Sequence, residues 1–193
     1  MKSFDRLILA VVTVLAFLPA TAGAQASGST FWVQIEGTKQ GLFANESVVA
    51  SRPNRILGRN FDYLVKVPRD ASTGALSGRR QHAPVVLTKE WGAASPQLFQ
   101  ALVSNEILKS VVFEFSQTNQ TTGQEEIVML VKLTGATVVE IHQYTAATVV
   151  GSTQHAVNPA GFRLEDVSFM FSGIEVQHLP GKTMAADQMG LTK

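Results

Sequence analysis

Apolar residues occupy every second position in short runs that recur between residues 31 and 178. Examples are the segment 31–37 (FWVQIEG) and the residues Val167, Phe169 and Phe171. Successive side chains of a strand point to opposite faces of a sheet, so this period of two predicts strands with one buried face. A helix needs a period near 3.6 residues, and one segment alone has it. The sequence therefore predicts a mainly β fold with one short helix.

The predicted strands are separated by segments rich in turn-forming residues. They are residues 31–37, 61–67, 84–88, 107–115, 127–133, 138–144 and 167–176. Residues 38–60 are rich in Gly, Ser, Asn and Arg, which predicts an extended loop. The alternation changes phase at Gly173, which predicts a β-bulge. No periodic pattern follows Pro180, so we expect residues 180–193 to form a mobile C-terminal tail.

Residues 95–105 have the helical period. Ser95 is expected to be the N-cap, and Pro96 the first helical residue, where its missing N–H costs nothing. Apolar residues then follow at intervals of four, which predicts one face that packs on the sheet. The residues expected to form that face are Leu98, Phe99 and Leu102.

Residues 1–26 are typical of a secretory signal peptide. Lys2 and Arg6 give a positive start, and residues 7–18 (LILAVVTVLAFL) are an uninterrupted apolar run. As a helix this run spans about 18 Å, which is short of a hydrocarbon core of about 30 Å. Small residues favour cleavage after Ala26, with Ala24 as the second choice. The alternative is an uncleaved N-terminal anchor.

Cleavage would leave a mature chain that is neutral overall. Residues 1–26 hold two of the 16 Lys and Arg residues and one of the 15 Asp and Glu residues, so 14 of each sign remain. A neutral chain without interleaved basic and aromatic residues is not expected to bind nucleic acid. No second long apolar run occurs, so no membrane contact is expected after cleavage. We expect residues 27–179 to form one exported domain, periplasmic or secreted.

The sequence contains no motif that predicts catalysis or metal binding. It has no cysteine, which excludes disulfides and thiolate metal sites. Its four histidines do not occur at ligand spacings. The carboxylates of Glu125 and Glu126 are adjacent, and neighbours on a strand point to opposite faces. We therefore expect a protein that is not an enzyme, with no catalytic, metal or cofactor-binding residue and no cofactor.

Charge is unevenly distributed in the otherwise neutral chain. Residues 52–80 carry seven basic and two acidic side chains, a net +5, whereas residues 106–126 carry four acidic and one basic, a net −3. One interpretation is two solvated stretches. The other is two oppositely charged edges of a protomer that assembles with itself. The candidate interface residues are Arg52, Arg55, Arg59, Arg79, Arg80, Glu114, Glu125 and Glu126.

Several blocks of the sequence resemble one known family. They are residues 78–90 (GRRQHAPVVLTKE), 94–114 (ASPQLFQALVSNEILKSVVFE), 140–144 (EIHQY) and 164–175 (LEDVSFMFSGIE), with a similar first strand at 31–37. In this order they resemble the Hcp family (haemolysin-coregulated protein), the tube proteins of the bacterial type VI secretion system.

The resemblance implies a closed antiparallel β-barrel flanked by a helix. It also implies homohexameric rings that stack into a tube, and partners among small effector proteins and other components of the secretion system. It implies no intrinsic catalytic site. The alternative function is a periplasmic or secreted β-barrel binding module that keeps this fold without a role in a tube. Ring assembly would favour the first function, and tight binding of a ligand by a monomer the second.

Overall fold

A computed structural model describes residues 31–47, 49, 52–145 and 163–189. The predicted signal peptide lies outside these residues. The elements in chain order are β1 (Phe31–Gly37), β2 (Gly41–Leu42), β3 (Ile56–Asp62), β4 (Val65–Lys66), β5 (Gln81–His82), β6 (Val85–Glu90), α1 (Ser95–Val103), β7 (Leu108–Thr118), β8 (Glu125–Tyr144), β9 (Leu164–Met170), β10 (Gly173–His178) and β11 (Thr183–Gln188). Among the described residues, no helix is long and apolar enough to span a bilayer.

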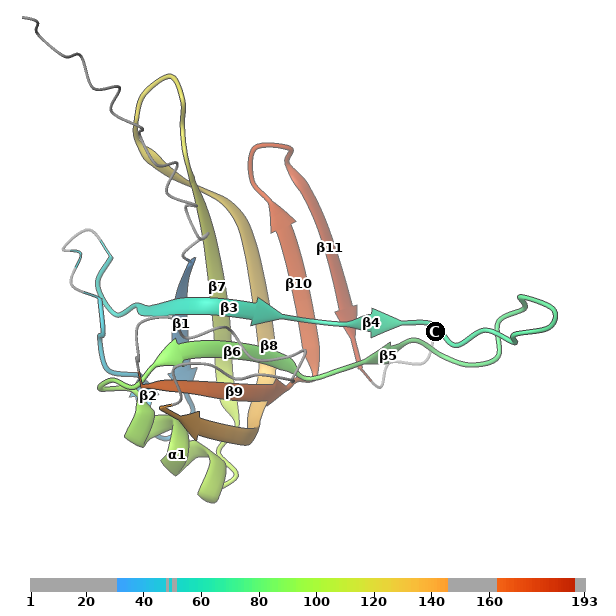
Figure 1. The fold of residues 1–193 in the computed structure, drawn as a ribbon, viewed down its shortest axis with the longest axis horizontal. Coiled ribbons are helices and arrows are strands. Elements are labelled where there is room, and N and C mark those ends of the chain that lie inside the picture. Colours follow the sequence, from blue (N-terminus) through green and yellow to red (C-terminus); the bar gives the residue numbers. More distant parts are fainter. Residues whose placement is uncertain (1–30, 48, 50–51, 146–162, 190–193) are drawn as a thin grey trace, which may run out of the picture.

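Six antiparallel strands form a closed barrel, as predicted. They follow the order β8-β7-β1-β3-β6-β9, and the pairing of β9 with β8 closes the ring of strands. The strand β8 makes this possible because it is 20 residues long. Its first half pairs with β7 and β10, and its second half pairs with β9. The hairpin β10–β11 continues the sheet beyond the barrel (Figure 1).

The long strand changes partner at Gly135. This residue has a φ of +55°, a conformation that other residues rarely adopt. A Cβ atom at this position would also lie 2.3 Å from the Ser172 hydroxyl, so a side chain here would require Ser172 to shift from its hydrogen bond to the Thr134 carbonyl. Sequence alternation predicted two strands here, and the structure has one strand with a bend. The predicted bulge at Gly173 is instead the start of β10, after Phe171 and Ser172 carry the chain from one sheet partner to the next.

The barrel interior is apolar through most of its length. Most inward residues of the barrel strands are apolar and buried, and four phenylalanines pack together inside. The ring centroids of Phe61 and Phe113 are 4.9 Å apart, as are those of Phe31 and Phe115. Aromatic pairs at this separation add to the stabilisation from burial. This cluster explains why the apolar alternation is strongest in β1 and β7.

The helix α1 forms where predicted but presents a different face. Its N-cap is Ala94 rather than Ser95, and Pro96 lies in the first turn. Leu98 is fully buried against the barrel, whereas Phe99 is 58% exposed, so the prediction that Phe99 packs on the barrel is wrong. Each residue turns the helix by about 100°, and the buried face runs through Leu98, Ala101 and the half-buried Leu102.

Three predicted boundaries also differ from the structure. The strand predicted at 61–67 is β3, which begins at Ile56 inside the expected loop 38–60 and ends at Asp62. That loop also contains β2, which pairs with β1. The expected mobile tail after Pro180 contains β11, because the backbone of 183–188 pairs with all of β10. Its side chains are mostly exposed on both faces, so no alternation marks it in the sequence.

Candidate assembly surfaces

Two of the predicted interface arginines, Arg52 and Arg55, pair with acidic residues of the same predicted set. Arg55 donates from Nη2 to Glu114 Oε1 at 2.7 Å and from Nε to Oε2 at 3.0 Å. The Arg52 guanidinium lies 3.5 Å from Glu114 and 3.4 Å from Glu125, over the ring of Trp32. The expectation of two separate charged edges is therefore wrong here, because β7 brings the acidic stretch next to the basic one.

The other predicted interface residues are dispersed. Arg59 pairs with Glu90, and Arg80 pairs with Asp187. Glu126 accepts a hydrogen bond from Asn119 at 2.9 Å, and Arg79 is exposed. An interface role for the eight residues stays a prediction.

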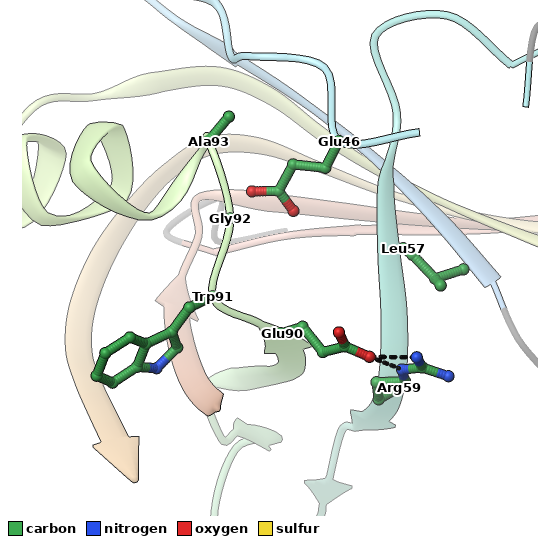
Figure 2. A pocket seen from close by; sticks show the side chains of 7 residues that line it. All are labelled: Glu46, Leu57, Arg59, Glu90, Trp91, Gly92 and Ala93. Carbon is green, nitrogen blue, oxygen red and sulfur yellow. Dashed lines mark hydrogen bonds and ion pairs between the residues drawn. The ribbon is translucent and has the colours of Figure 1, made fainter. Parts of the chain in front are cut away.

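A pocket of about 370 Å³ opens between β3 and the segment that leads into α1. Figure 2 shows the Arg59–Glu90 pair on one side of it and the Glu46 carboxylate on another. Glu46 accepts a hydrogen bond from the Ala94 N–H at 2.7 Å. Trp91 is held at the rim by its indole N–H, which donates to the Leu164 carbonyl at 2.8 Å. The residues that line the pocket are Glu46, Leu57, Arg59, Glu90, Trp91, Gly92 and Ala93.

A buried ion network lies beside this pocket, next to the first residue of α1. The Lys89 Nζ is 2.9 Å from Glu165 Oε1 and 3.2 Å from Glu46 Oε1. Ser95, the predicted cap, instead donates to Glu165 at 2.6 Å, and Gln143 donates to its other oxygen at 2.7 Å. Sequence reasoning missed this network, although Lys89 follows Val85 and Leu87 at every second position and so continues their inward face.

A second buried carboxylate, Glu106, fixes the turn after β1. It accepts hydrogen bonds from the Lys39 N–H at 2.6 Å, the Gln40 N–H at 3.0 Å and the Gln40 side-chain amide at 2.9 Å. Burial raises the pKa of Glu106, but these hydrogen bonds outweigh it and hold the pKa below its ordinary value. The charge of Glu106 therefore serves the fold and does not face a partner.

The outer wall of β6, β8 and β9 carries a hollow of about 690 Å³. Asp166 lies in it and accepts hydrogen bonds from Thr88 at 2.6 Å and Tyr144 at 3.3 Å. Burial, the charge of Asp166 and this hydrogen bond raise the pKa of Tyr144 to about 12. In the described part of the chain no three His, Asp or Glu side chains are grouped to hold a metal ion.

Residues 64–82, here named the arm, extend away from the barrel as a two-stranded ribbon (Figure 1). At its tip Asp70 Oδ1 accepts hydrogen bonds from the N–H and the hydroxyl of both Ser72 and Thr73, at 2.6–3.0 Å. Hydrogen bonds, with that of the Ser72 hydroxyl foremost, lower the pKa of Asp70 to about 2. The exposed apolar side chains of the arm are Leu64, Val65, Val67 and Leu76.

Comparison with known proteins gives a consistent result. A family model described as "Type VI secretion system effector, Hcp" matches residues 32–178. The "Major exported protein" of Pseudomonas aeruginosa is 33% identical over 165 residues, and the match covers 81% of this chain and 92% of that protein. The solved structure of secreted protein Hcp3 from Pseudomonas aeruginosa is 28% identical, with a TM-score of 0.63 over 82% of this chain and 97% of that one.

A further structure, of a mutant Hcp1 protein from E. coli EAEC 042, supports the barrel fold. Its TM-score is 0.70 at 23% identity, over 82% of this chain and 97% of that one. Proteins of this family are structural and non-enzymatic parts of the secretion system. The family model spans most of the chain and the relative in Pseudomonas aeruginosa is aligned over nearly its whole length, so the chain belongs to the Hcp family, the secreted tube proteins of type VI secretion.

Proposed function

We propose that the chain assembles into hexameric rings, that the rings stack into a tube, and that the tube carries small effector proteins. Proteins of the Hcp family form hexamers. The observation on this chain that carries the proposal is the arm, whose apolar side chains lie in solvent although they belong to a hydrogen-bonded ribbon.

The arm has the composition of a surface that is covered in an assembly. Leu76 is 67% exposed, and three further apolar side chains of the arm are about half exposed. Large contiguous exposed apolar surface on a folded protein marks an interaction site. The arm also carries four basic residues and one acidic residue, a net +3 in a chain of net charge +1. Contact between the arm and a different surface of a neighbour would be heterologous, the type of contact that closes into rings or continues into filaments.

Light scattering on the mature chain, residues 27–193, tests the assembly. We expect a mass of about six protomers. Leu76→Ser should weaken assembly, whereas Val139→Ser, at an exposed apolar position on the barrel wall, serves as the matched control. Electron microscopy of concentrated samples tests stacking into tubes. A strictly monomeric protein at high micromolar concentration would overturn the ring proposal and would favour a monomeric binding module.

We also propose that residues 1–26 are removed during export. The intact mass of the protein from its native host should correspond to a chain that begins at Ser27 or Gln25. A soluble protein that retains Met1 would contradict this proposal. Effector carriage is tested by the proteins recovered with purified rings: small effectors should be retained by rings and released when the rings dissociate.

A further inference from the structure

The root of the arm is joined to β11 by a continuous set of hydrogen bonds. Arg80 donates to both carboxylate oxygens of Asp187, and its Nη2 also donates to the Gln188 carbonyl at 3.2 Å. His82 Nε2 lies 2.9 Å from Asp187 Oδ2, and His82 Nδ1 lies 2.6 Å from the Tyr63 hydroxyl. Tyr63 lies just before the arm, and Arg80 and His82 lie where the arm ends. Asp187 therefore contacts the end of the arm directly, through Arg80 and His82, and contacts Tyr63 at its start indirectly, through His82.

Aromatic packing encloses these polar contacts. The Phe171 ring packs edge-on against Tyr63 and His82, with centroids 6.1 Å and 5.8 Å away. The His82 side chain is only 6% exposed. Hydrogen bonds from Arg80 lower the pKa of Asp187, against the effect of burial, and His82 lowers it further. Asp187 is therefore an ionised, charge-assisted acceptor at the point where the arm leaves the barrel.

The arm has little else to fix its direction. Its two strands make two residue pairs, Val65 with His82 and Lys66 with Gln81, and the Ala83 N–H donates to the Leu64 carbonyl at 2.9 Å. An isolated two-stranded ribbon is marginally stable in water. Those pairings hold the two strands together, but they do not set the angle of the ribbon to the barrel. Figure 1 shows β11 ending beside β4 and β5, where a contact can set that angle.

We propose that Asp187 is a positioning residue, through which β11 fixes the direction of the arm and presents its apolar side chains to a second copy of the chain. The second part rests on the proposed ring function. The residues matched by the family model end at 178, so β11 lies beyond the match and the inference rests on the contacts of this chain.

Hydrogen exchange on the mature chain, diluted until monomeric, tests the positioning separately from assembly. In Asp187→Asn the amides of the arm root, at 65, 66, 81 and 82, should exchange about tenfold faster or more, with barrel amides unchanged. Glu175→Gln, one strand away on β10, is the matched control and should leave the arm unchanged. Asp187→Glu keeps the charge and should restore most of the protection. Unchanged exchange at the arm root in Asp187→Asn would overturn the proposal.

The charge-swapped double variant Arg80→Asp/Asp187→Arg guards against a general loss of folding. The double variant should recover the protection of the arm amides from exchange that each single variant loses. Equal loss of protection in all three variants would contradict a specific contact between Arg80 and Asp187. Light scattering on the same variants then tests the second part. Suppose that the arm of Asp187→Asn exchanges faster, but that this variant forms rings at the same protomer concentration as the wild-type chain. Then β11 does not govern how the arm is presented to a second copy, and the proposal of ring assembly itself stands. If the wild-type chain forms no rings, the proposed function fails, and the exchange data still decide the role of Asp187.

Discussion

Replacing Lys89 with Met should destabilise the fold far more than a comparable change at the surface. The ammonium of Lys89 and the carboxylate of Glu165 have no exposed surface and lie 2.9 Å apart, with Glu46 at 3.2 Å. Methionine keeps most of the volume but leaves two carboxylates without their cation. Removal of one partner from a buried ion pair costs about 3–5 kcal/mol. Ser95 and Gln143 still donate to Glu165, so we expect the lower end, about 3 kcal/mol, or a melting temperature roughly 6–12 °C lower.

Urea unfolding at one fixed protomer concentration measures this change, because assembly itself adds stability. Lys109→Met is the matched control: its pair with Glu36 is largely exposed and should contribute less than about 1 kcal/mol. The double variant Lys89→Met/Glu165→Leu should be more stable than Lys89→Met alone, since it removes the unpaired charge. An effect of Lys89→Met no larger than that of Lys109→Met would refute the reasoning.

Three further predictions concern the helix, a buried carboxylate and the arm tip. In the dissociated chain, Leu98→Ala should lower the free energy of unfolding by about 2–5 kcal/mol. Phe99→Ala should lower it by less than about 0.5 kcal/mol, because its side chain is exposed. Equal losses of the two variants in urea unfolding would contradict the orientation of the helix. Although burial raises it, hydrogen bonds hold the pKa of Glu106 below its ordinary value, so its contribution to stability is present above the pKa of the unfolded chain and is lost as the pH falls through the folded pKa. Glu106→Gln should therefore lower the urea midpoint at neutral pH and less so in acid, whereas a pH-independent difference would argue against the hydrogen-bond explanation. By NMR the Asp70 carboxyl should titrate at about 2, and Ser72→Ala should raise that value; a wild-type titration near 3.8 would show that the tip hydrogen bonds are absent in solution.

The strands that sequence patterns located are those with one buried face. Alternation found β1, β6 and β7 because their inward residues are apolar. It missed the start of β3, where Gly58, Arg59 and Asn60 interrupt the pattern although the backbone pairs with β6. It missed β11 because the side chains of that strand are largely exposed on both faces. For such strands the pairing partner, and not the residue pattern, determines the structure.

The charged sites were harder to predict than the fold because they depend on contacts between distant segments. The pairing of Arg55 with Glu114 follows from the adjacency of β1, β3 and β7, which no local pattern contains. On the helix, Leu98 and Phe99 both have apolar partners four residues later, so two neighbouring stripes were equally plausible from sequence. The barrel selects the stripe of Leu98, and Phe99 is left in solvent.

The place of β9 in the chain has a consequence for when the protein can fold. β9 makes two of the pairings of the barrel, with β6 and with the second half of β8, and it begins only at Leu164. Before those residues are synthesised, both strands are open edges, and pairings between distant segments form slowly. The growing chain therefore stays unclosed for most of its synthesis. Closure of the barrel by β9 is therefore the late step that commits the chain to the folded protomer.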